Sequence, residues 1–128
     1  MFENLQVFRL AHAKSVHAAT RQALFAQNMA NADTPGYTAR DLPRFSEIIR
    51  DDPAAFGLRA TRATHLNGTN RPLQAEIFER PAEKNPNGNS VSLETEMLHA
   101  ADAQRQHDRA LSIYKASLGV LRTAIGRP

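Results

Sequence analysis

Proline and glycine are unevenly distributed along this 128-residue chain, and their distribution limits where long helices can form. Residues 1–32 contain neither residue type, whereas six of the seven prolines fall in residues 34–89. A proline lacks the backbone donor and clashes with the preceding helical turn, so no long helix can run through this middle part. The sequence therefore predicts one structural unit in which two helical segments, 1–33 and 90–128, flank an irregular one.

Hydrophobic periodicity supports a helix in each flank, because residues three and four apart share one side of a helix. In the N-terminal flank the stripe comprises Leu5, Phe8, His12, Ser15, Ala19, Gln22, Ala26 and Met29. In the C-terminal flank a stronger heptad stripe comprises Leu93, Met97, Ala100, Gln104, His107, Leu111, Tyr114, Leu118, Leu121 and Ile125. Polar residues within both stripes weaken a pairing of two helices alone. We therefore expect a mainly α fold whose terminal helices pair as an antiparallel coiled-coil-like bundle and need further partners.

Local signals mark the end of the first helix. Thr34 precedes a proline and is disfavoured in a helix, while Pro35 and Gly36 suit the central positions of a type II turn. The first helix should therefore end near Ala32.

The second helix has a plausible N-cap in Ser92, whose hydroxyl can accept a backbone hydrogen bond. Glu94 and Glu96 then lie in the first turn, where a carboxylate interacts favourably with the helix dipole. Both signals place the start of this helix near residue 93.

The middle segment is too rich in proline and glycine for a long regular element. A short helix over Ser46–Arg50 and short strands near Leu58–Thr64 and Gln74–Phe78 are compatible with its sequence, which allows a short β-hairpin. A stretch of this length inside a compact domain is uncommon, so we expect it to order against neighbours. Since both stripes also lack partners in a monomer, the isolated chain is expected to lack a cooperative fold over much of its length.

The charge distribution gives little support for nucleic-acid binding. The net charge is +3, with three basic residues and one acidic in residues 1–32, eight of each in 33–89, and five basic and four acidic in 90–128. A nucleic-acid binder needs clustered cations to displace counterions. A small helical adaptor or a basic nucleic-acid-binding module remains the alternative function.

No constellation of catalytic or metal-binding residues is apparent. Cysteine is absent, which excludes thiolate chemistry. His12 and His17 are five residues apart and His99 and His107 eight apart, whereas a helical zinc pair needs a spacing of four. We expect no enzymatic activity, no metal, no cofactor and no small-molecule substrate.

Membrane and export signals are also missing. No apolar run approaches the roughly 20 residues of a membrane-spanning helix, and the N-terminus has no apolar region typical of a signal peptide. If the protein leaves the cytoplasm, it is expected to use another route.

The most specific local feature is the run Asn28–Tyr37, which reads NMANADTPGY. This run resembles the signature of the flagellar rod and hook axial proteins, which close their N-terminal helix in such a stretch. Within that family, further segments are similar to the proximal rod proteins: Thr38–Leu42, Leu58–Thr61, His65-Leu66, Asn87–Glu94 and Leu121–Gly126. The resemblance covers nearly the whole chain and is weakest over residues 43–56 and 68–86.

The resemblance implies a structural subunit of the basal-body rod that assembles helically and transmits torque. It implies export through the flagellar type III apparatus without signal cleavage, and a periplasmic location in the rod. The implied partners are copies of itself, the other proximal rod proteins, the rod adapter protein and the membrane-embedded basal ring. Signature and stripe positions together give the expected assembly residues: Leu5, Phe8, Asn28, Asn31, Thr34, Pro35, Gly36, Tyr37, Leu93, Met97, Leu111, Tyr114, Leu118, Leu121 and Ile125.

Overall fold

The structure is a computed structural model that describes residues 2–51 and 75–126, with side chains from residue 6 onward. It is mainly helical, as the sequence predicts. The elements in chain order are α1 (Phe2–Ala30), β1 (Arg40–Asp41), α2 (Phe45–Asp51), β2 (Phe78–Glu79) and α3 (Leu93–Ala124).

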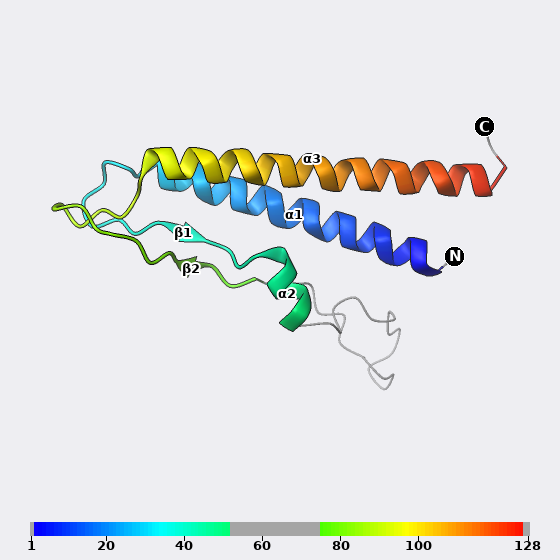
Figure 1. Cartoon of the computed structure of the whole chain (residues 1–128), viewed down its shortest axis with the longest axis horizontal. Coiled ribbons are helices and arrows are strands. Elements are labelled where there is room, and N and C mark those ends of the chain that lie inside the picture. The colour runs from blue at the N-terminus through cyan, green and yellow to red at the C-terminus, as the bar shows by residue number, and fades with distance from the viewer. Residues whose placement is uncertain (1, 52–74, 127–128) are drawn as a thin grey trace.

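The two long helices lie antiparallel along each other, so that the start of α1 and the end of α3 are at the same end of the molecule (Figure 1). The rings of Phe8 and Tyr114 meet edge to face near this open end, with centroids 5.1 Å apart. The rings of Phe25 and His99 stack at 5.3 Å near the other end. The two-stranded sheet and α2 lie beside α1 (Figure 1). The predicted antiparallel pairing of the terminal helices is confirmed.

Small residues form most of the contact between the helices. Ala11 and Ala18 of α1 are buried, as are Ala103 and Ala110 of α3. Phe25 is the one large apolar side chain on this seam that is fully buried among the described residues. Alanine side chains allow two helices to approach closely, whereas larger ones would hold them apart.

The predicted stripes are correct at some positions and displaced by one residue at others. Phe8, Ser15, Gln22 and Met29 are half-buried as predicted, but His12, Ala19 and Ala26 are exposed, and the residues that precede each of them are buried. In α3, Met97, Gln104 and Leu111 are exposed, and again the preceding residues are buried. The displacement does not follow residue size, because Ala110 is buried in place of Leu111 but Phe25 is buried in place of Ala26.

The ends of the helices follow the sequence signals in part. α1 ends at Ala30, two residues before the predicted end. Ser92 occupies the N-cap position of α3 with an extended backbone, but its side chain makes no capping hydrogen bond. The predicted role of the Ser92 hydroxyl is therefore wrong.

The middle segment contains the short helix that the sequence allowed, α2. The small sheet pairs Arg40 with Glu79 and Asp41 with Phe78 in antiparallel register. The strand expected near residues 74–78 overlaps β2 only at Phe78, and its partner β1 was not predicted. The strand expected near residues 58–64 lies outside the described residues. No helix in the described ranges has the length and apolarity to cross a bilayer.

Candidate assembly interface

The turn after α1 has the geometry that its sequence predicts. The Tyr37 N–H donates to the Thr34 carbonyl oxygen (3.3 Å), and Gly36 has a φ of +73°. A hydrogen bond across four residues with a positive φ at the third defines a type II turn. The chain thus reverses direction and returns along α1.

A single buried asparagine joins this turn to the loop before α3. Asn89 is fully buried, and its Nδ2 donates to the carbonyl oxygens of Asn31 (2.9 Å) and Thr34 (2.7 Å). Its Oδ1 accepts the N–H of Val91 (2.7 Å). The Gly36 N–H also donates to a carbonyl oxygen of this loop, at 3.0 Å. Two sequence motifs that lie more than 50 residues apart therefore form one structural unit.

Asn28 makes a second such junction. Its Nδ2 donates to the Arg40 carbonyl oxygen (2.8 Å) and to Glu96 Oε2 (2.9 Å). Its Oδ1 accepts the Arg40 N–H (3.0 Å) and the Tyr37 hydroxyl (3.2 Å). The side chain is fully buried, so one amide connects α1, β1 and α3. Asn28 organises the fold and offers no surface to a partner.

Four charged side chains complete this buried polar cluster. Arg21 donates two hydrogen bonds to the Asp41 carboxylate, from Nε to Oδ1 (2.9 Å) and from Nη2 to Oδ2 (3.0 Å). Arg80 bridges two carboxylates, because Nη1 donates to Glu96 Oε1 (2.6 Å) and Nη2 to Asp41 Oδ2 (3.2 Å). Two positive and two negative groups balance, which a low-dielectric site requires. The cluster ties both helices to the small sheet.

The surroundings keep the Asp41 carboxylate of this cluster ionised. Burial acts to raise the pKa of the Asp41 carboxyl, but hydrogen bonds from Arg21 and the Leu42 N–H, with the charges of Arg21 and Arg80, hold the pKa below its usual 3.8. Both guanidinium groups also lie over the ring of Phe25, at 5.0 Å and 5.5 Å from its centroid. The Phe25 ring thus packs against His99 and contributes a cation–π contact to the cluster.

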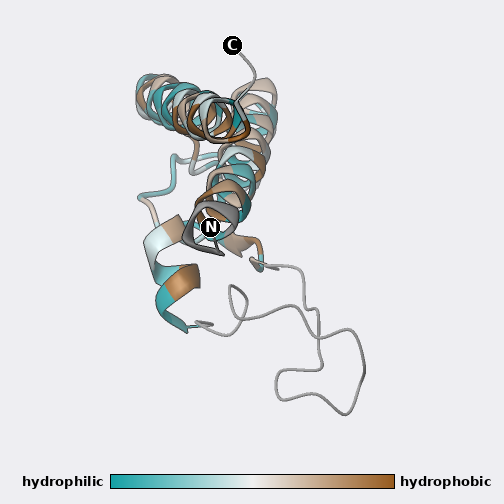
Figure 2. Cartoon of the chain, turned by 90° about the vertical axis from the view of Figure 1, so that its right-hand side faces the viewer, coloured by the Kyte–Doolittle hydropathy of each residue, from teal (hydrophilic) through white to brown (hydrophobic). Residues whose placement is uncertain are grey.

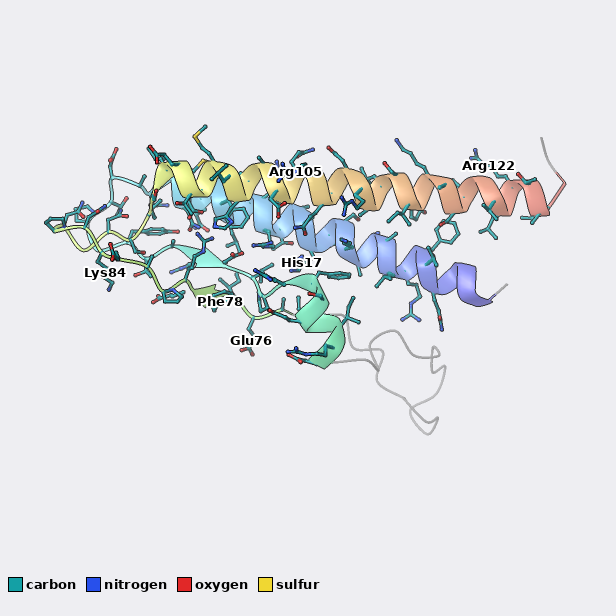
Figure 3. The ribbon with its side chains drawn as sticks, viewed as in Figure 1. His17, Glu76, Phe78, Lys84, Arg105 and Arg122 are labelled. Atoms are coloured by element: carbon teal, nitrogen blue, oxygen red, sulfur yellow. The ribbon has the colours of Figure 1, made fainter. Side chains whose placement is uncertain are left out.

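His17 holds the segment before α2 against α1 (Figure 3). Its Nε2–H donates to the Pro43 carbonyl oxygen (2.8 Å), and its ring lies 5.5 Å from that of Phe45. The buried Nδ1 has no hydrogen-bond partner among the described residues. Burial lowers the pKa of His17 below 6.5, and the neighbouring cations Arg21 and Lys14 lower it further, against the opposing effects of Pro43 and Asp41. The imidazole is therefore neutral at pH 7.

The expected assembly residues fall into three groups. Asn28 is buried in the polar cluster, while Asn31, Thr34, Pro35, Gly36 and Tyr37 form the turn. Phe8, Leu118 and Leu121 are half-buried along the helix pair. The exposed group comprises Leu93, Met97, Leu111, Tyr114 and Ile125. The side chain of Leu5 lies outside the described part of the chain.

Several residues of the cluster were not predicted as site residues: Arg21, Asp41, Arg80, Asn89 and Glu96. Glu96 was assigned to the helix dipole, yet it is 1% exposed and lies on the buried face of α3. Its heptad position, shared with Ala103 and Ala110, is a signal that could have identified it. The described residues contain no group of three potential metal ligands.

Comparisons with known proteins place the chain among flagellar proteins. It is 36% identical over 102 residues to the flagellar basal body rod protein FlgB of Escherichia coli, covering 73% of this chain and 74% of the relative. It is 30% identical to FlgB of Salmonella typhimurium, with 78% of each chain covered. Identity to FlgB of Agrobacterium fabrum is 28%, over 88% of this chain and 87% of the relative. No protein-family model matches the chain.

Replacing Asn28 with alanine should destabilise the fold, because it removes the amide that pairs with Glu96 Oε2, with the Arg40 backbone and with the Tyr37 hydroxyl. Each buried polar group left unpaired costs about 1–3 kcal/mol. The matched control is Gln27→Ala, which changes an exposed side chain one residue earlier. Urea unfolding followed by circular dichroism should show a large decrease in the free energy of unfolding for Asn28→Ala and a small one for Gln27→Ala. Equal decreases would contradict the role of the cluster.

Acidification should destabilise the protein through His17. Because its pKa is lower in the folded chain than the 6.5 of the free side chain, the unfolded chain takes up a proton first. Stability should therefore fall as the pH drops below about 6.5. His17→Gln keeps a donor for Pro43 but does not titrate, so its stability should change less between pH 7.5 and 5.5.

The control for this comparison is His12→Gln, at an exposed position on the same helix. It should retain the pH dependence of the original protein in urea titrations at the two pH values. Identical pH dependence in His17→Gln and the original protein would show that His17 is not responsible.

Gly36→Val should destabilise the turn, since a β-branched residue at a φ of +73° is strained by roughly 1–3 kcal/mol. No atom lies within 4 Å of a Cβ added at Gly36, so the effect is one of backbone conformation. Gly119→Val is the control, because Gly119 lies in α3 with open space around it. Thermal melting should give a lower Tm for Gly36→Val than for Gly119→Val. Equal Tm values would show that the turn does not require glycine.

Proposed function

The chain belongs to the FlgB family of flagellar basal-body rod proteins, and from this premise we propose that it assembles helically through its two terminal helices and transmits torque along the rod. The observation that carries the proposal is how little of α3 is covered within one chain. Of its 32 residues only Glu96, Ala103 and Ala110 are buried. A single subunit therefore leaves most of this helix available to neighbours.

The exposed apolar residues of α3 occupy both sides of the seam. Leu93, Met97 and Leu111 follow one helical row, whereas Leu98, Ile113 and Val120 follow another. At 100° per residue the two rows lie roughly 90–100° from the buried row, in opposite directions. Figure 2 shows hydrophobic residues on more than one side of the helix pair. Apolar rows on both sides of one helix would allow the subunit to contact a neighbour on each side, as in a tube of subunits.

The helix α1 contributes to the same surface. Val7, Leu10 and Val16 are exposed along it, with Val16 half accessible at 51%. Large apolar surfaces on a soluble chain generally mark sites of protein association. The turn and the polar cluster hold the two helices in register, so that the rows of one subunit face a neighbour as a rigid unit.

We further propose the partners and route that accompany this role. The chain would contact copies of itself, the other proximal rod proteins, the rod adapter protein and the membrane-embedded basal ring. It would leave the cytoplasm through the flagellar type III apparatus without a cleaved signal peptide and reside in the periplasmic rod. No catalytic step is part of this role, which agrees with the names of its relatives.

Leu118→Asp should abolish rod formation in a strain whose only copy carries the change. Leu118 is half-buried in the isolated chain, and neighbouring helices would cover the remainder. Loss of a buried leucine costs roughly 2–5 kcal/mol, and an unpaired buried carboxylate adds a desolvation cost. The exposed Lys115 should tolerate glutamine, because a surface charge contributes less than about 1 kcal/mol.

The two strains are compared by their motility and their basal-body yield. Immunoblots of the exported protein distinguish a defect in assembly from a defect in secretion. The original gene should restore motility in the same deletion strain. Normal rods with Leu118→Asp, or equal damage from Lys115→Gln, would refute the proposed use of this helix face. A deletion strain that swims normally would refute the proposed function itself.

A further inference from the structure

A groove of about 800 Å³ runs between α1, α2 and α3. Its apolar lining includes Val7 and Leu10 of α1, Phe45 and Ile49 of α2 and Ile113 of α3. Val7, Leu10 and Ile113 are 36–41% exposed, so the apolar floor is accessible. None of its lining residues belongs to the turn, and few of them belong to the polar cluster. An exposed apolar floor of this kind generally marks a site of association.

The border of this groove is strongly cationic. Four basic side chains that take no part in the polar cluster line it: Lys14, Arg44, Arg105 and Arg109. The one carboxylate of the lining is Asp102, which pairs with Arg105 at 3.2 Å on the exposed surface. Within the described ranges no carboxylate lies within 4.0 Å of the side-chain nitrogens of Lys14, Arg44 or Arg109, although Glu47 accepts the Arg44 backbone N–H at 3.2 Å. The occupant should therefore be apolar with an excess of negative charge.

The same chain carries a surface of this composition around β2. Ile77 and Phe78 are 55% and 41% exposed. They are flanked by the exposed carboxylates of Glu76 and Glu79. Glu79 lies opposite Arg40 in the sheet, whereas Glu76 precedes β2 and forms no ion pair with another described residue.

The charge around this strand extends along the connection to α3. Between residues 75 and 95 the exposed charged side chains are four carboxylates and one cation, Lys84. The additional carboxylates are those of Glu83 and Glu94. Figure 3 shows Glu76 directed away from the helix pair, on the outer edge of the molecule. The acidic excess of this region is thus opposite in sign to the groove border, where four cations outside the polar cluster accompany one carboxylate.

We propose that the groove of one subunit binds the acidic β2 segment, residues 75–79, of a second copy of this chain. Ile77 and Phe78 supply the apolar contact, and the carboxylates around them face the cationic border. The groove and the segment are different surfaces, so the contact is head-to-tail and can continue from copy to copy along a helical assembly. The inference rests on the proposed function, because it assumes that copies of the chain meet in the rod.

Site-specific cross-linking tests the contact, because the chain has no cysteine of its own. Ile77→Cys and Ile113→Cys are introduced into two copies with different tags, co-expressed in a strain that lacks its own gene. Oxidation of isolated basal bodies should give a dimer that carries both tags. Ser112→Cys, exposed and outside the groove lining, replaces Ile113→Cys as the control and should give little dimer.

Charge reversal gives an independent readout. Glu76→Arg or Arg109→Glu alone should lower the dimer yield by at least roughly tenfold, because like charges brought together oppose association. The two reversals combined, one in each surface, should restore it. Circular dichroism of each purified variant shows whether a loss reflects unfolding, and a folded variant that cross-links normally counts against the contact.

Normal rods without a dimer of the two tagged copies would overturn the proposed contact and leave the rod function standing. A cross-link from the groove to a different protein would also overturn it. Absence of a rod defect in the gene-deletion strain would instead overturn the function on which the proposal rests.

Discussion

The guanidinium group of Arg80 bridges two buried carboxylates, and most of the remaining structure depends on this arrangement. Asp41 comes from the small sheet and Glu96 from the first turn of α3, while Arg21 and Asn28 of α1 supply their other partners. Buried charges are tolerated only when all of them are paired, and removal of one partner is strongly destabilising. The segment between the helices is therefore fixed to them at one place. Its position determines the register of α1 against α3, the closure of the turn and the placement of the groove between α1, α2 and α3.

The division between small and large apolar residues explains how such a chain can be both folded and available for assembly. Alanines form the seam between the helices, so the antiparallel pair is close but buries little apolar area. The leucine, isoleucine, valine and methionine side chains of α3 lie mostly outside this seam. They are exposed in one chain and would be covered only when neighbours pack on both sides. The polar cluster then fixes the arrangement within the subunit, and the exposed rows would stabilise the assembly.

Much of the architecture could be predicted from the sequence, because local signals determine it. The absence of proline and glycine from the first 32 residues gave α1, and Pro35 with Gly36 gave the turn. The stripes were displaced by one residue at several positions, since periodicity alone does not show which of two adjacent residues faces the partner helix. The polar cluster was not predicted, because Glu96 meets Asn28 from 68 residues away and Arg80 from 16. Contacts of this kind follow from tertiary packing and produce no periodic pattern in the sequence.

Native-state hydrogen exchange on the full chain tests most directly whether the cluster couples the middle segment to the helices. The amides of Arg40, Arg80 and Ser90 are hydrogen-bonded within or beside the cluster. If the account is correct, they open with the same free energy as helix amides in residues 20–30 and 95–105, as one cooperative unit, whereas the expectation from the sequence alone is that much of the isolated chain lacks a cooperative fold. Exchange of the Arg40, Arg80 and Ser90 amides at the rate of an unstructured peptide, while those helix amides remain protected, would contradict it.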